Sequence, residues 1–434
     1  MNFVLVPLIF TIMAQSICAE SLVFPPYFHS YGIRKATQQH LIMFGGPFNS
    51  FVNPQGIATT KMISRDEPAN EKDDDEVVVY GVNSGRHMLI YNTSMYALAL
   101  YGSRGSGKDN FLFPRGIAAD PEGRVYVADA GNNRIVQLFN PQKNVRWVRS
   151  FGAVIAGTDP LRAPDQIGLD RSGNVYVTDK GNRRIVVFDS SGTFKTIIKP
   201  SVHKTTAAFI DGPTTLAIAD GWDKWSFFGN ERVVFCADQN GHRLWKLSLT
   251  GEVLKTITLS EPNQAAYAAV DYYHNLYITD SLNHRILKYD HNLEILDTIG
   301  SFGNDKNQFV APRGIGIWKR YGQTFVAERE GAQYYWHGTR AIGPVTMQRD
   351  KGAFILALTT SDYSFASLFS TKGRDTTYFL NKQFIPAGRN LIPIVKSART
   401  DSMSGKKIQL KLEPTYSSYT YNAWFYPVLK GANQ

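Results

Sequence analysis

One motif recurs along this chain and constrains its fold more than any other feature. An apolar–aromatic–apolar run ending in Asp is followed by a short turn and then by Arg and an apolar residue, at 125–135, 175–185 and 276–286, with a looser copy at 234–244. The alternation predicts β-strands, and repetition every ~40–60 residues is typical of radial arrays of small β-sheets. The motif therefore predicts an all-β repeat protein.

A second signature precedes each copy of the motif. It places a Pro before an apolar strand at 51–58, 111–118 and 309–316, and weaker forms stand at 161–168 and 211–217. Turn sequences rich in Asp, Pro and Gly, such as 120–123 and 170–173, separate the alternating runs. We expect four antiparallel strands per unit, which is one blade of a β-propeller.

The first and last units depart from the motif. In the first, Gly81 is aligned with the motif Asp and Arg86 with the motif Arg, whereas the last has Glu328 and Gln333. Counting these gives six units, and atypical terminal repeats are expected. We predict that residues 39–45 form a strand that completes the last unit and leaves no free sheet edge.

These residues resemble NHL repeats, whose Pro-x-Gly-Ile segment, Tyr-Val-x-Asp strand and Asn-x-Arg-Ile turn are matched by the second, third and fifth units. The resemblance covers about residues 38–340 and implies a six-bladed β-propeller. NHL propellers include enzymes, RNA-binding proteins and protein-interaction scaffolds, so the resemblance alone names no activity.

The residue after each inner-strand Pro is expected to face one opening of the central channel. These positions hold Gln55, Arg115, Asp165, Thr214, Ala266 and Arg313. Two arginines and an aspartate suit an anionic or polyhydroxylated ligand, because guanidinium presents a fixed fork of donors. The alternative is an internal Arg115–Asp165 pair that only plugs the channel.

The repeated acidic and basic residues are predicted to be structural. We expect Asp and Arg to pair within each motif, as Asp129/Arg134, Asp179/Arg184, Asp238/Arg243 and Asp280/Arg285. Cys236 lies within a predicted strand and is interpreted as a small buried residue. The other cysteine, Cys18, lies within residues 1–19, which are predicted to be a cleaved secretory signal. Cys236 would then have no partner for an internal disulfide.

Two enzyme branches with similar repeats carry metal ligands that can be compared with the channel positions of this chain. The lyase that acts on peptidyl-hydroxyglycine holds zinc with histidines just after the inner-strand prolines, and none of those positions is His here. Lactonase-like propellers surround calcium with Glu, Asn and Asp, of which only Asp165 is present. We therefore predict no catalytic residues, no metal site and no cofactor, and we keep a metal-dependent hydrolase or lyase as the alternative.

The first 19 residues are predicted to be a secretory signal. The apolar run 3–13 is followed by Gln15, Ser16 and Ala19, and an uncleaved anchor is the alternative, although the run is short for a ~20-residue span. The signal favours a secreted, periplasmic or cell-envelope location with no membrane span after cleavage. It also argues against the RNA-binding alternative, although the formal net charge of +10 suits anionic partners.

Short strand-like runs separated by turn residues continue after the repeats end. They predict a small Ig-like β-sandwich over 345–434, similar to modules found at the ends of bacterial secreted proteins. Together these features predict a non-enzymatic binding or scaffold protein that uses the propeller face or channel to engage a protein or a glycan. Nucleic acid is not an expected partner, and no oligomeric state is predicted.

Overall fold

The computed structural model describes most of the chain in two units. The residues described are 21–23, 35–47, 49–65, 77–94, 97–142, 144–199, 201–202, 205–206, 212–220, 226–238, 242–259, 264–350, 353–394, 408–416 and 424–428. One unit comprises 22–337 with 416–420, and the other 338–415 with 1–21 and 421–434. The predicted signal at 1–19 lies outside the described residues. No helix in the described ranges is long and apolar enough to cross a membrane.

Within the described residues, the larger unit contains six antiparallel sheets of four or more strands, called here the first to the sixth sheet in chain order. Their strands are β3 (Pro54–Lys61), β4 (Val77–Asn83), β5 (Met88–Ser94) and β6 (Ala97–Tyr101); β9 (Pro114–Ala119), β10 (Arg124–Asp129), β11 (Arg134–Phe139) and β12 (Arg146–Phe151); β13 (Pro164–Leu169), β14 (Val175–Asp179), β15 (Arg184–Phe188) and β16 (Phe194–Ile198); β19 (Pro213–Ala219), β20 (Val233–Asp238), β21 (Arg243–Ser248) and β22 (Val253–Thr258); β23 (Ala265–Val270), β24 (Leu276–Asp280), β25 (Arg285–Tyr289) and β26 (Ile295–Ile299); and β29 (Ile315–Trp318), β30 (Gln323–Glu328) and β31 (Gly331–His337).

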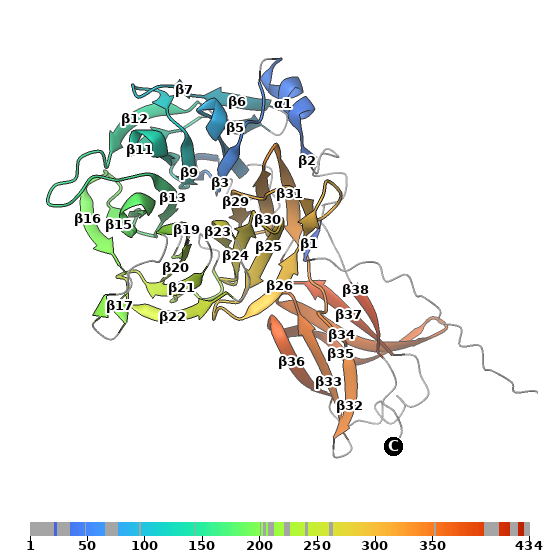
Figure 1. Ribbon diagram of the computed structural model, residues 1–434. Helices are drawn as coiled ribbons and strands as arrows, with labels where there is room; N and C mark the ends of the chain where they lie inside the picture. The colour runs from blue at the N-terminus through green and yellow to red at the C-terminus, as the bar shows by residue number, and fades with distance from the viewer. Residues whose placement is uncertain are drawn as a thin grey trace, which may run out of the picture. The chain divides into compact units, whose positions relative to one another are not determined.

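The first strand of each sheet lies innermost, and these inner strands form a closed ring. Each contacts the inner strand of the next sheet, and β29 contacts β3 (Figure 1). Apolar side chains of neighbouring sheets pack between them, for example Tyr80 and Val82 with Ile117 and Val127. The two-residue strands β7 (Ser103–Arg104) with β8 (Asn110–Phe111), β17 (Ser201–Val202) with β18 (Thr205–Thr206), and β27 (Ser301–Phe302) with β28 (Gln308–Phe309) pair outside these sheets.

The glycine of the Pro-x-Gly-Ile segment is required by the close approach of inner strands. A Cβ on Gly116 would lie 2.2 Å from the Asp165 carbonyl oxygen, and one on Gly314 would lie 2.1 Å from the Gln55 carbonyl oxygen. Neither distance is tolerated by a side chain. The motif glycine is therefore a packing requirement at the axis of the ring.

The closure of the sixth sheet differs from the prediction. Residues predicted as a strand, 39–45, belong to helix α1 (Gln38–Gly45), and β31 pairs with β1 (Leu22–Val23) and β2 (Lys35–Ala36). The helix is favoured locally because the His40 ring accepts a hydrogen bond from the Thr37 amide, and Gly46 ends it at φ 102°. An earlier segment thus takes the place predicted for 39–45.

The register of the first sheet also corrects the alignment. Pro54 faces Asn83 across β3 and β4, as Pro114 faces Asp129 in the second sheet. Asn83 rather than Gly81 therefore takes the place of the motif Asp, and it accepts a hydrogen bond from the Val52 amide. Met88, which pairs with Asn83, takes the place predicted for Arg86.

Short 3₁₀ turns link the second and third strands of several sheets. They are η2 (Ser84–Arg86), η3 (Ala130–Asn132) and η4 (Lys180–Asn182), and η1 (Ile63–Arg65) follows β3. Each of the first three ends in a residue with left-handed φ: His87, Asn133 and Arg183. The Asn of the motif suits this conformation better than most residues.

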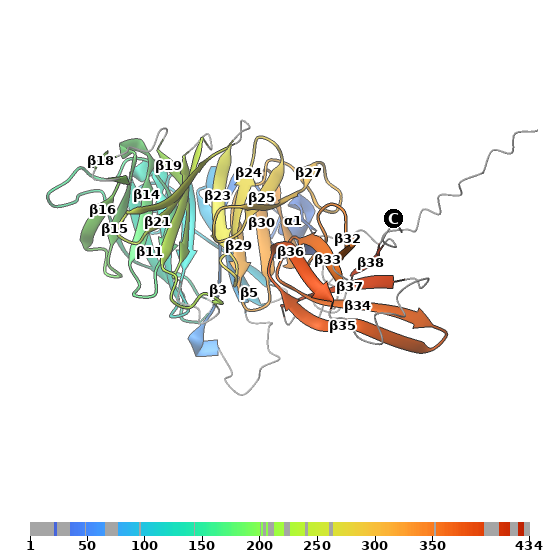
Figure 2. The same ribbon diagram turned by 90° about the horizontal axis from the view of Figure 1, so that it is seen from below.

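The smaller unit contains two antiparallel sheets, drawn in orange and red in Figure 2. One has the order β32 (Thr346–Asp350), β33 (Ala353–Thr360), β36 (Gly388–Ile394); the other has β35 (Asp375–Ile385), β34 (Ser364–Lys372), β37 (Ile408–Pro414), β38 (Trp424–Val428). The predicted strands at 353–360, 376–380, 390–395 and 408–412 fall within or largely within these elements. The strand β34 was not predicted, although Leu368 on it is fully buried.

Candidate functional site

Five of the predicted channel residues carry polar side chains, and they gather at one end of the inner-strand ring. Arg115 Nη1 lies 3.5 Å from Asp165 Oδ2, and Thr214 donates to the Ala265 carbonyl at 3.1 Å. We call this group, together with Tyr267, the polar end; its members are Gln55, Arg115, Asp165, Thr214, Tyr267 and Arg313. The sixth predicted position, Ala266, adds no polar atom.

Tyr267 was missed by the sequence analysis. Ala265 faces Asp280 and so holds the place of the inner-strand Pro, which puts Tyr267 where three other units have Gly. Its hydroxyl donates to Gln55 Oε1 at 3.2 Å, linking β23 to β3. A bulky aromatic residue at a motif glycine position was the signal that could have identified it.

The charges at the polar end are unequal. Burial lowers the pKa of Arg313, and nearby Arg115 lowers it further. Asp165 raises the pKa of Arg115, and burial lowers the pKa of Lys180, which Asp165 partly offsets. Three cations therefore share one carboxylate, and the surplus positive charge favours an anion.

Two buried polar atoms of the polar end have no hydrogen-bond partner among the described residues. They are Asp165 Oδ1 and Arg313 Nε. An unsatisfied buried acceptor or donor costs ~1–3 kcal/mol, so such atoms are expected to meet water or a ligand. The predicted Arg115–Asp165 pair thus forms, but it leaves these two polar atoms of the polar end without a hydrogen-bond partner among the described residues.

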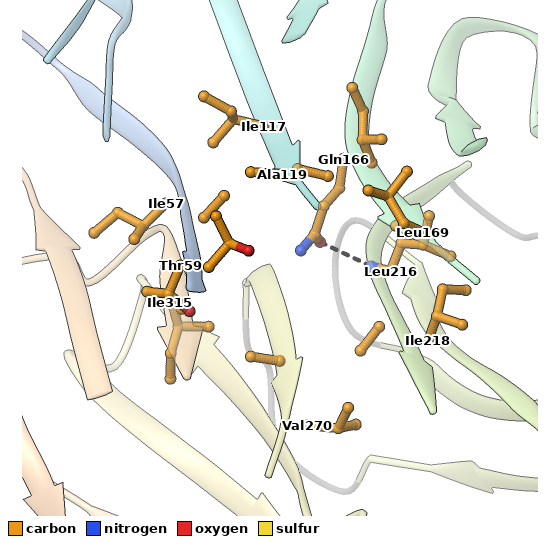
Figure 3. A pocket seen from close by; sticks show the side chains of 18 of the residues that line it. Ile57, Thr59, Ile117, Ala119, Gln166, Leu169, Leu216, Ile218, Val270 and Ile315 are labelled. Atoms are coloured by element: carbon orange, nitrogen blue, oxygen red, sulfur yellow. Dashed lines mark hydrogen bonds between the residues drawn. The ribbon is translucent and has the colours of Figure 1, made fainter. Parts of the chain in front are cut away.

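Gln166 divides the channel. Its side chain accepts from the Leu216 amide at 2.7 Å and donates to the Ala268 carbonyl at 3.0 Å, joining β13 to β19 and β23 (Figure 3). Like Tyr267, it stands where other units have Gly. Beyond it lies a cavity of about 180 Å³, lined mainly by apolar side chains that include Ile57, Ile117, Leu169, Leu216, Ile218 and Val270.

The repeat pairs form within three of the sheets. The distances from Arg Nε to Asp Oδ2 are 2.8 Å for Asp129/Arg134, 2.7 Å for Asp179/Arg184 and 3.0 Å for Asp280/Arg285. In the fourth sheet Asp238 is fully buried, and the described contact of Arg243 is with the Trp245 ring, 5.6 Å from its centroid. The Asp side chains also accept hydrogen bonds from amides just before the inner strand of the same sheet: Asp129 accepts from the Leu112 amide and Asp179 from the Arg162 amide.

A second connection joins neighbouring sheets and was not predicted. The left-handed turn residues His87, Asn133 and His284 each accept a hydrogen bond from an amide that precedes the inner strand of the next sheet; the donors are Phe113, Ala163 and Ala311, at 2.8–3.0 Å. His284 precedes the motif Arg of the fifth unit. Its Nδ1 links the fifth sheet to the sixth.

The described channel residues offer few groups for metal or covalent chemistry. Asp165 is the single carboxylate among the six predicted positions, and none of them is His. Cys236 is completely buried, and burial together with Asp238 raises the pKa of its thiol, so a reactive thiolate is disfavoured there.

Comparison with known proteins supports the fold class. Residues 111–138 match the NHL repeat model. No curated protein matches the chain. The ring of sheets and this match define an all-β protein of the β-propeller class that carries an NHL repeat.

Several solved propeller-like structures resemble the chain at low identity. A streptogramin B lyase is 13% identical, covering 66% of this chain and 94% of its own with a TM-score of 0.42. A virginiamycin B lyase from Staphylococcus aureus with quinupristin is 14% identical, and the match covers 66% of this chain and 96% of the lyase with a TM-score of 0.43. A gluconolactonase from Xanthomonas campestris is 12% identical, and the match covers 73% of this chain and 98% of the gluconolactonase with a TM-score of 0.46. No activity is carried over from proteins this distant.

Proposed function

We propose that this chain is an extracytoplasmic binding protein whose polar end engages an acidic glycan without chemically altering it. In this proposal the larger unit is a six-bladed NHL-type propeller and the smaller unit is an Ig-like module that acts as a spacer or attachment unit. A protein carrying acidic side chains is the alternative partner. The apolar run at 3–13 supports export, and the net charge of +10 supports an anionic partner.

The observation that carries the proposal is the pair of unsatisfied atoms at the polar end. Arg313 Nε can donate to a ligand carboxylate, and Asp165 Oδ1 can accept from a sugar hydroxyl. Arg115, whose side chain is 39% exposed, adds a second guanidinium at the same opening. A uronate residue presents a carboxylate beside hydroxyl groups and satisfies both kinds of atom.

The test is a binding titration of the purified chain with uronate-containing and neutral oligosaccharides of equal length. Wild type should bind the acidic series in a salt-sensitive manner. Arg313→Gln should weaken binding ~10–100-fold, as expected for loss of a charged hydrogen bond. The matched control Arg149→Ala removes an exposed arginine on the outer strand β12 and should bind like wild type.

Three results would overturn this proposal. Equal binding by wild type and Arg313→Gln would remove the polar end from recognition. Selective capture of an acidic protein, with no glycan binding, would replace the ligand class. Stoichiometric zinc or calcium that is lost in Asp165→Ala would favour the metal-dependent hydrolase or lyase instead.

A further inference from the structure

A serine, a histidine and a glutamate outside the channel form a continuous hydrogen-bonded chain. Ser226 Oγ lies 2.5 Å from His274 Nε2, and His274 Nδ1 lies 2.7 Å from Glu231 Oε2. Ser226 and Glu231 lie in the connection between β19 and β20, and His274 lies in the turn between β23 and β24. Residues from two neighbouring sheets therefore meet at the end of the ring opposite the polar end.

The connection that carries Ser226 is longer than its counterparts in other sheets. In the second and third sheets the first two strands are joined by tight turns closed by Gly123 and Gly173. In the fourth sheet the connection extends from Asp220 to Arg232, and the Phe227 amide donates to the Tyr272 carbonyl at 2.9 Å. This bond fixes the connection against the turn that holds His274.

The order of the hydrogen bonds matches that of a nucleophile, a base and a positioning carboxylate. Glu231 also contacts Lys246 Nζ at 2.5 Å. Burial raises the pKa of Glu231, but hydrogen bonds from His274 and Lys246, with His291 Nδ1 3.5 Å from Glu231 Oε1, outweigh it and lower this pKa overall. An ionised Glu231 accepts from Nδ1–H of His274, so the Nε2 lone pair is directed at the Ser226 hydroxyl.

The exposure of the three residues also fits this order. His274 is only 1% exposed, and its left-handed backbone at φ 56° is held by a turn bond to the Asp271 carbonyl. Ser226 is partly exposed. A buried base that hydrogen-bonds a partly exposed serine is an arrangement that nucleophilic catalysis uses.

We propose that Ser226, His274 and Glu231 form a serine-hydrolase site that acts on carboxylic esters. Ser226 Oγ attacks the ester carbonyl carbon while its proton passes to His274 Nε2. Collapse of the tetrahedral intermediate breaks the acyl C–O bond, and His274 returns the proton to the leaving alcohol. Water, deprotonated by His274, then attacks the acyl carbon. Collapse of this second intermediate breaks the bond between the acyl carbon and Ser226 Oγ, and His274 returns the proton to Oγ, so that ester and water become acid and alcohol.

The surroundings of Ser226 indicate an ester with an apolar acyl group. Phe227, next in the chain, is 45% exposed, and its ring lies 5.1 Å from that of Phe228 and 5.3 Å from that of Tyr273. The exposed ring of Phe227, beside the nucleophile, offers an apolar surface to the acyl chain. The site goes beyond the proposed glycan binding and shares no residue with it.

The test uses a fluorophosphonate probe and p-nitrophenyl butyrate with the full chain. Peptide mass spectrometry should locate the covalent adduct on Ser226. Ser226→Ala should abolish labelling and lower hydrolysis at least ~100-fold. The control Ser191→Ala removes an exposed serine that hydrogen-bonds Asp189 without a histidine, and it should match wild type.

Glu231→Gln tests the positioning residue. It should lower kcat ~10–100-fold with little change in KM, since the carboxylate orients His274 and does not touch the ester. Arg149→Ala, at an exposed arginine of β12 that belongs to neither site, should leave hydrolysis unchanged. Absence of an adduct on Ser226 in the folded wild type, or hydrolysis unchanged in folded Ser226→Ala, would overturn the proposal.

Discussion

Lys35 Nζ lies 3.1 Å from Glu328 Oε2 and joins the N-terminal strand β2 to the acidic end of β30. In the second, third and fifth sheets the corresponding carboxylate is paired with the motif Arg of its own sheet. In the sixth sheet Gln333 replaces that Arg, and a residue 293 positions away supplies the cation. The degenerate last motif is thus completed by the segment that closes the ring.

We expect Lys35→Met to lower the free energy of unfolding by ~1–3 kcal/mol, because Glu328 is only 1% exposed and would lose its cation. Adding Gln333→Arg should recover part of the loss by restoring the motif pair. Urea unfolding measures both effects. Lys199→Met, at an exposed lysine, is the control, and equal loss in both lysine variants would contradict the argument.

The link between the fifth and sixth sheets predicts a ranking of substitutions at His284. His284→Ala should cost ~1 kcal/mol, since the Ala311 amide loses its acceptor. His284→Asn should cost less, because Asn133 performs this role between the second and third sheets. Thermal unfolding of the two variants provides the comparison, and a more stable Ala variant would refute the link.

Two buried histidines predict a loss of stability in acid. Burial and Arg104 lower the pKa of His87, although Asp129 opposes them; burial and Lys288 lower the pKa of His337 well below its ordinary value of 6.5. As the pH falls, these two histidines are therefore protonated in the unfolded chain before they are protonated in the folded chain. The stabilisation is present above pH ~6.5 and is lost progressively below it.

The measurement is urea unfolding at pH 7.5 and pH 5.5 for wild type, His87→Asn and His337→Phe. Asn keeps an acceptor for the Phe113 amide, and Phe keeps the ring stacked on Tyr277, but neither titrates. Each variant should lose less stability between the two pH values than wild type. An unchanged difference in both variants would assign the acid sensitivity to other groups.

The motif glycine predicts a steric effect at the axis. Gly116→Ala should destabilise the larger unit by ~1–3 kcal/mol, because the new Cβ would meet the backbone of β13. Gly229→Ala is the matched control, since no atom lies within 4 Å of a Cβ there and its φ is not in the left-handed region. Similar chemical unfolding midpoints for both variants would show that the inner strands can move apart.

Much of the ring could be predicted from the chain because its signals are local. Alternation in 175–179 predicts a strand, the Asp–Arg spacing predicts the pair at Asp179 and Arg184, and the position after each Pro predicts the polar end. The helix at Gln38–Gly45 was predicted wrongly, since an apolar run of that length does not distinguish a helix from a strand without its partner. The register of Asn83 likewise required the observed pairing with Pro54.

The sequence by itself determined the repeated sheets, the Asp–Arg pairs of the regular motifs and the variable residues at one end of the ring, because each depends on neighbours in the chain. Only the tertiary structure decided that Lys35 completes the last motif, that Tyr267 and Gln166 reach other inner strands, and that Ser226 meets His274 and Glu231. Each of these contacts joins residues from different sheets or distant segments. No periodicity records such a contact, since it depends on how the sheets pack around the axis.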